Sequence, residues 1–140
     1  MKNSRNLLGL VVLLVVVAVA VGFNKPKKPK QTKRVGMVIG LREEMIDEYK
    51  RIHADNHPGV RDLLSKYHME NFNIFLQKMP DGKYYEFGYY EYTGDDFEGD
   101  MAKLAKEKRN IEWLKVCDPM QIPLPGAKGW TEMECVYFNP

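Results

Sequence analysis

Hydrophobic residues recur at every second position in several short segments of the chain, a period that is typical of half-buried β-strands. In the first segment Val35, Met37 and Ile39 alternate with glycine and valine, so one face of this strand is unusually small. The second and third segments are joined by KMPDG, which has the residues of a tight turn. The pattern predicts four strands, at residues 34–41, 71–77, 83–92 and 130–138.

Between these strands the hydrophobic residues change to helical spacing. One helical region covers residues 42–68, and a Pro-Gly pair divides it into two parts. A second helical region covers residues 94–118, where Asp95 or Asp96 is suited to cap the first turn. The predicted element order is therefore β-α-β-β-α-β.

This order predicts an α+β fold of the ferredoxin-like type, in which an antiparallel sheet carries both helical regions on one face. The opposite face would be too polar for a core and too aromatic for plain contact with water. We therefore expect a homodimer in which two such faces oppose each other and close an α+β barrel around a pocket. Besides tyrosines and glutamates of the third strand, this face is expected to carry Gly36, Gly40, Asn71, Asn73, Glu132 and Glu134.

An apolar run without any charge, from Leu7 to Phe23, precedes the predicted domain. Its length of about 17 residues is at the short edge of what spans a membrane and is long for the core of a signal peptide. The Lys-rich residues that follow favour an uncleaved membrane anchor, whereas Ala18 and Ala20 form an A-x-A cleavage site. We expect residues 1–23 to form a hydrophobic helix that associates the protein with a membrane, with secretion after signal cleavage as the alternative.

Charge is unevenly distributed: the net charge is +2, but the basic residues are concentrated at 25–34. This stretch makes residues 24–34 a basic linker to the domain at 35–140, and it could also lie against an anionic membrane. Without it the chain is slightly acidic, so the composition does not favour binding to nucleic acid. Cys117 and Cys135 are too few for a disulfide framework and are expected to be buried thiols, unless export allows them to pair.

Candidate chemistry centres on one helical stripe, where His53 follows Tyr49 by one turn. His53 can give and take a proton near neutral pH, but it could also serve only to interact with the dipole at a helix end. His53 and His57 have the spacing of metal ligands, yet Pro58 interrupts the helix and no third ligand stands nearby, so we expect no metal site here. No phosphate-binding loop or nucleophile elbow occurs, and a pocket of aromatic, amide and carboxylate side chains suits a neutral sugar.

Six short motifs occur in an order and spacing that are specific as a set. They are YKRIH at 49–53, ENFNIFL at 70–76, YYEFGYYEYTGDDFEGDM at 84–101, EWLKVCDPMQ at 112–121, PLPG at 123–126 and MECVYF at 133–138. Through these motifs the chain from Val35 to its C-terminus resembles the L-rhamnose mutarotase family.

The resemblance implies a dimeric α+β barrel and an isomerase of the aldose 1-epimerase type, which exchanges the α and β anomers of L-rhamnose without metal or cofactor. It places the proton-donating histidine of the family on His53 and a sugar contact on Tyr49. It also places sugar contacts on Phe72, Glu112 and Trp113, where the family has a tyrosine and a pair of tryptophans. A hydroxyl group and one aromatic ring are therefore replaced in this chain, and the expected substrate is L-rhamnose or a related sugar.

Two functions of different classes are consistent with these residues. The first is a membrane-tethered mutarotase, which the retained Tyr49 and His53 favour. The second is a non-catalytic, membrane-tethered module that binds a sugar or another protein, which Phe72 and Glu112 leave open.

Overall fold

The computed structural model describes residues 32–139 of the chain. The predicted membrane segment at 1–23 and most of the linker at 24–34 lie outside this range. Among the residues that it does describe, no helix is both long enough and apolar enough to cross a membrane.

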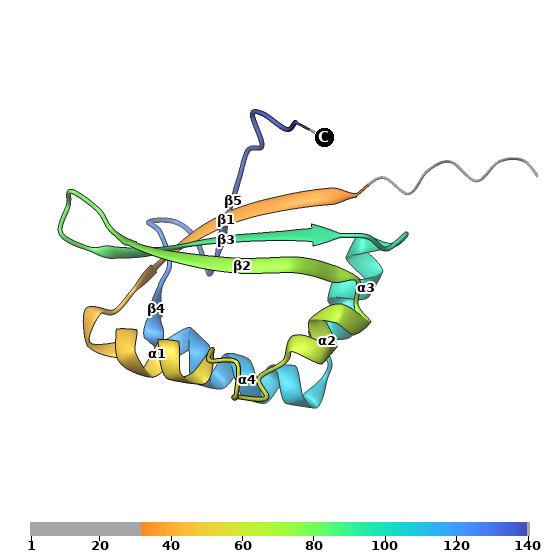
Figure 1. The fold of residues 1–140 in the computed structure, drawn as a ribbon, viewed down its shortest axis with the longest axis horizontal. Helices are drawn as coiled ribbons and strands as arrows, with labels where there is room; N and C mark the ends of the chain where they lie inside the picture. Colours follow the sequence, from red (N-terminus) through yellow and green to blue (C-terminus); the bar gives the residue numbers. More distant parts are fainter. Residues whose placement is uncertain (1–31, 140) are drawn as a thin grey trace, which may run out of the picture.

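The described chain forms an antiparallel sheet with its helices on one side (Figure 1). The hydrogen-bonded order of the strands is β2-β3-β1-β4, and β5 also pairs with β1. The predicted α+β arrangement, with an antiparallel sheet and the helices on one of its faces, is therefore confirmed. The strands are β1 (Lys33–Leu41), β2 (Met69–Lys78), β3 (Tyr84–Tyr92), β4 (Gln121–Ile122) and β5 (Thr131–Met133).

The first helical region has two parts, as the Pro-Gly pair predicts. The second region, which the sequence predicts as one helix, is divided because Glu107 has an extended backbone and its carboxylate accepts a hydrogen bond from the Tyr67 hydroxyl group at 2.6 Å. Asp96 is the N-cap of its first helix, and its side chain accepts a hydrogen bond from the Gly99 N–H group at 3.0 Å. The helices are η1 (Glu43–Met45), α1 (Ile46–Ile52), α2 (Arg61–Lys66), α3 (Phe97–Leu104), α4 (Lys108–Cys117) and η2 (Asp118–Met120).

The last predicted strand is the least accurate prediction of the fold. Of residues 130–138 only Thr131–Met133 pair with β1, and the chain beyond them leaves the sheet (Figure 1). The sequence also missed β4, which occupies the part of β1 next to Leu41. The edge of the sheet beside β1 is therefore shared by two short strands.

Side chains alternate along β3 between the helix-facing and the outer side of the sheet. Glu86, Gly88, Tyr90 and Tyr92 are buried toward the helices, while the residues between them are only half-buried. Glu132 lies directly opposite Met37 in the pairing of β5 with β1, so it is on the helix-facing side. The prediction that Glu132 lies on the outer face is therefore wrong, because the register of β5 differs by one residue from the expected one.

We expect Gly40→Ala to destabilise the fold, because a Cβ atom at this position would lie 2.8 Å from the Ile122 carbonyl oxygen, which is backbone and cannot turn aside. The expected loss is about 1–3 kcal/mol in the free energy of unfolding, measured with urea. Gly36→Ala is the matched control, since its Cβ atom would meet only the end of the flexible Met133 side chain, at 3.4 Å. Equal losses in the two variants would contradict this account of β4.

Candidate active site

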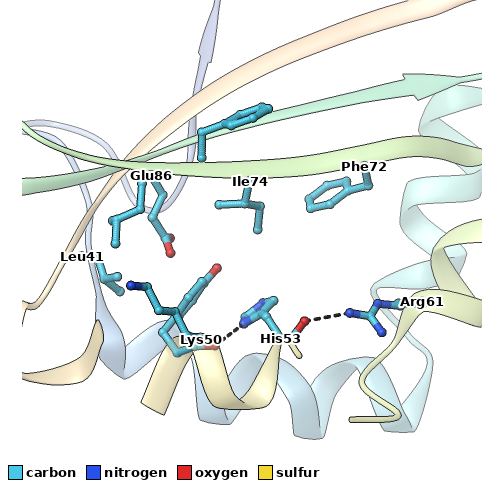
Figure 2. A pocket seen from close by; sticks show the side chains of 10 residues that line it. Leu41, Lys50, His53, Arg61, Phe72, Ile74 and Glu86 are labelled. Atoms are coloured by element: carbon cyan, nitrogen blue, oxygen red, sulfur yellow. Dashed lines mark hydrogen bonds between the residues drawn. The ribbon is translucent and has the colours of Figure 1, made fainter. Parts of the chain in front are cut away.

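A cavity of about 490 Å³ lies between the sheet and α1 (Figure 2). Tyr49 and His53 line it from the helix side, and Phe72 and Ile74 of β2 line it from the sheet. Glu86 of β3 projects into it from above. This cavity is on the helix-facing side of the sheet, within one chain. The sequence did not predict a cavity on this side: the bulky side chains of β3, such as Phe87, point outward, and its small Gly88 faces the helices. The pocket expected between two outer faces of a dimer stays a prediction.

His53 is the residue immediately after the last turn of α1. Its Nδ1 atom lies 2.8 Å from the Tyr49 carbonyl oxygen, so Nδ1 carries the hydrogen and Nε2 is the nitrogen that can accept a proton. Burial lowers the pKa of His53 below its ordinary value of 6.5, and the positive charge of Arg61 acts in the same direction. The imidazole is therefore mainly neutral at neutral pH.

Two aromatic rings fix the position of this imidazole. The Tyr49 ring stacks on it with centroids 4.0 Å apart, and the Trp113 ring of α4 meets it edge-on at 5.1 Å. Arg61 also holds the backbone at this point, because its guanidinium donates a hydrogen bond to the His53 carbonyl oxygen at 2.7 Å (Figure 2). The structure thus brings together three of the residues that the sequence singles out.

Phe72 joins this group and Glu112 does not. Phe72 lines the cavity and stacks on Tyr90, with ring centroids 5.6 Å apart. Glu112 is exposed on α4, where it accepts a hydrogen bond from Lys115 at 2.8 Å. One residue along a helix is a rotation of about 100°, so Glu112 points away from the side on which Trp113 reaches His53.

Glu86 is a site residue that the sequence reasoning missed. Its side chain is 1% exposed, and one carboxylate oxygen, Oε2, accepts a hydrogen bond from the Gln121 amide at 2.9 Å. The other oxygen, Oε1, has no hydrogen-bond partner among the described residues. Burial raises the pKa of Glu86 from 4.5 to about 7, although the hydrogen bond from Gln121 and the nearby Tyr49 hydroxyl group oppose this rise. The signal in the sequence was a carboxylate at a helix-facing position of β3.

Other polar groups near the cavity are less suited to proton transfer. Burial raises the pKa of Tyr49, and the nearby charge of Glu86 raises it further, so its phenol stays protonated and can donate a hydrogen bond. Burial also raises the pKa of the free Cys117 thiol to about 12. Cys135, expected to be buried, is exposed because the chain has left the sheet there. Within residues 32–139, no three His, Cys, Asp or Glu side chains gather in a way that could hold a metal ion.

The fold and the site define a small α+β protein with a pocket for a small molecule, in which an imidazole, a phenol and a carboxyl group meet. A sequence model of L-rhamnose mutarotase matches residues 34–138, which is most of the chain. The chain therefore belongs to the L-rhamnose mutarotase family, as the motifs predict.

Two individual relatives carry the name L-rhamnose mutarotase. The protein from Lactiplantibacillus plantarum is 29% identical over 87 residues, which cover 62% of this chain and 78% of the relative. The protein from Oceanobacillus iheyensis is 28% identical over 88 residues, which cover 63% of this chain and 79% of the relative.

We expect the stability of the protein to depend on pH through Glu86. The folded protein keeps the proton of a carboxyl group whose pKa is about 7, while the unfolded chain loses it near 4.5. Stability therefore falls as pH rises through this window, by at most about 3 kcal/mol. The lowered pKa of His53 acts in the opposite direction, because the unfolded chain binds that proton more tightly.

Glu86→Gln removes the carboxyl group, so the variant should not lose stability through this ionisation. The free energy of unfolding of the variant, relative to that of the parent, should therefore increase as pH rises from about 5 to about 8. Urea unfolding at a series of pH values measures this difference. The control is Glu70→Gln, since Glu70 is exposed on β2. A difference between Glu86→Gln and the parent that is the same at every pH would show that Glu86 ionises normally.

Proposed function

We propose that this protein is a mutarotase, an isomerase that interconverts the α and β anomers of L-rhamnose or a related deoxy sugar. The observation that carries the proposal is the His53 imidazole, which is fixed through Nδ1 and lines the cavity, so that its Nε2 can take up a proton and give it to a sugar oxygen. The names of the relatives in the family support the choice of reaction and of sugar.

Mutarotation needs one group that handles the ring oxygen of the sugar. When the bond between C1 and the ring oxygen breaks, its electron pair stays on that oxygen, which takes a proton. The anomeric hydroxyl loses a proton at the same time, and its electron pair completes the aldehyde. After rotation about the bond between C1 and C2, the ring closes on the other face of the aldehyde. His53 is assigned to the ring oxygen, where it gives the proton on opening and takes it back on closing.

The other residues bind the sugar. Tyr49 and Trp113 supply a hydroxyl donor and an aromatic ring on either side of His53. Phe72 and Ile74 form an apolar part of the wall, and a cavity of about 490 Å³ is within the range of small-molecule sites. Glu112 takes no part in this arrangement, because it is on the outer side of α4.

A non-catalytic sugar-binding module is the second candidate function. The observation in its favour is Phe72, which lines the cavity without the hydroxyl group that the family's tyrosine has at this position. An N-terminal membrane anchor is part of either proposal, with signal cleavage as its alternative, and carbonate extraction of membranes distinguishes the two.

A homodimer is also part of the proposal. The outer face of the sheet carries Phe75, which is 64% exposed, and a hollow of about 370 Å³ that is lined by Val38, Tyr85 and Phe87. Exposed aromatic surface of this kind is typical of a protein interface. The two sheets are proposed to pack through these faces and leave the helix-side cavities open.

We expect His53→Ala to slow anomer exchange by about 10²- to 10⁴-fold while sugar affinity changes only several-fold, because acid–base catalysis acts on the barrier. Tyr49→Phe should instead weaken binding by about 1 kcal/mol, through the loss of one hydroxyl contact. Saturation-transfer NMR over a panel of sugars measures the exchange.

The matched control for His53→Ala is His68→Asn. His68 does not line the cavity, and asparagine tolerates its positive φ of 62°. If His53→Ala exchanges anomers as fast as the parent, His53 is only a helix-end residue. If the parent itself binds a sugar without exchange above the spontaneous rate, the protein is the binding module.

We expect Phe75→Glu to convert the dimer to a monomer with little loss of fold, because this exposed side chain contributes to the interface and not to the core. Sedimentation velocity measures the assembly, and circular dichroism checks the fold. Val116→Glu is the control, since Val116 is 45% exposed on α4, which lies on the helix side. A parent that sediments as a monomer at micromolar concentration would exclude the dimer.

A further inference from the structure

We propose that the carboxyl group of Glu86 is the second proton-transfer group of the mutarotase, acting on the anomeric hydroxyl while His53 acts on the ring oxygen. This inference rests on the proposed function and adds a catalytic residue to it. Glu86 and His53 line the same cavity but belong to different layers of the fold.

Glu86 reaches the cavity from the sheet, whereas His53 reaches it from the end of α1. Both line the same space, and Figure 2 shows the Glu86 carboxylate directed from β3 toward the helix layer. A sugar held between the sheet and α1 would therefore have one group on each side. Such a pair suits mutarotation, because the ring oxygen gains a proton and the anomeric hydroxyl loses one.

The hydrogen bonds of Glu86 leave one oxygen for a ligand. Oε2 accepts from the Gln121 amide at 2.9 Å, while the buried Oε1 has no hydrogen-bond partner among residues 32–139. A buried oxygen without a hydrogen bond is unfavourable, because it has lost its contact with water. The hydroxyl group of a bound sugar would remove this cost by donating to Oε1.

A purely structural role for Glu86 does not need a carboxyl group. The amide of Gln121 requires only an oxygen acceptor, which a glutamine at this position would also provide without the cost of burying an ionisable group. No lysine or arginine forms an ion pair with Glu86 in the described chain. Packing alone therefore does not account for a carboxyl group at position 86, whereas proton transfer in the cavity does.

The protons and electrons of the step balance between the two residues. On ring opening, protonated His53 gives its Nε2 proton to the ring oxygen, and ionised Glu86 takes the proton of the anomeric hydroxyl. The open-chain aldehyde is then held between a neutral imidazole and a neutral carboxylic acid. On closing, the hydroxyl returns its proton to His53 as its oxygen attacks C1, and Glu86 returns its proton to the aldehyde oxygen.

The electrostatic environment supports this pairing. Burial lowers the pKa of His53 and raises that of Glu86 to about 7, so the one proton that the two groups hold between them lies mainly on Glu86. The reactive form, with this proton on His53 and with Glu86 ionised, differs from the resting form only by a proton transfer. The other titratable groups around Glu86 are Tyr49 of α1 and Cys117 of α4, both with raised pKa values, and Lys50 lines the same cavity.

The test is the exchange rate and the pH profile of Glu86→Gln, measured by saturation-transfer NMR with L-rhamnose on the full-length protein. We expect exchange to slow by about 10²-fold or more, sugar affinity to stay within several-fold, and one limb of the bell-shaped pH profile to disappear. A merely structural role would leave both limbs. Glu70→Gln is the matched control, and formate should partly restore the rate of Glu86→Ala by replacing the carboxyl group.

Each outcome decides a different point. If the parent exchanges anomers and Glu86→Gln does so equally fast, the role of Glu86 is overturned and the proposed function stands. If the parent shows no exchange with any sugar that it binds, both are overturned. If neither variant folds, NMR of the carboxyl carbon in the parent decides: a buried glutamate that titrates near neutral pH and shifts with bound L-rhamnose supports the proposal, and one that the sugar leaves unchanged refutes it.

Discussion

The alternation of side chains along β3 is the constraint on which the site depends. Because successive residues of a strand point to opposite faces, Glu86 and Gly88 share the helix-facing side with Tyr90, while Phe87 faces outward. Gly88 adds no side chain to this layer, and a Cβ atom there would lie 2.8 Å from Met37. A shift of one residue in register would exchange the two sets. The cavity would then lose its carboxyl group, and the core would lose its tyrosines.

Burial then gives the site its chemistry. The Glu86 carboxyl and the His53 imidazole are both removed from water, and removal from water favours the neutral form of each. The two pKa values therefore move toward each other, although the groups differ by about two units in model peptides. Tyr49 connects them physically, since its ring stacks on His53 and its hydroxyl group lies 3.4 Å from the Gln121 amide that binds Glu86.

Local patterns in the sequence predict those features of the fold that are set by residues close together in the chain. The period of two locates β1, β2 and β3, the Pro-Gly pair divides the first helical region, and one helical turn relates Tyr49 to His53. What could not be predicted depends on distant contacts. A period of two shows that faces alternate but not which face the helices cover, so the sequence did not predict the cavity on the helix-facing side. Glu86 and Gln121 are 35 residues apart, and the pairings of β1 with β3 and with β4 bring them together. The strand predicted at 130–138 is short because the chain leaves the sheet after Met133.

The cavity wall has an apolar part and a polar part, and this division suits a deoxy sugar. Phe72 and Ile74 make one part of the wall apolar, and Glu86 with Tyr49 makes the other part polar. A deoxy sugar has the same division, with a methyl group at one end and the anomeric centre at the other. In the proposed function its methyl group would lie beside Phe72 without leaving a hydroxyl group unpaired, as a fully hydroxylated sugar would. The anomeric centre would then face His53 and Glu86, the two residues to which we assign the proton transfers.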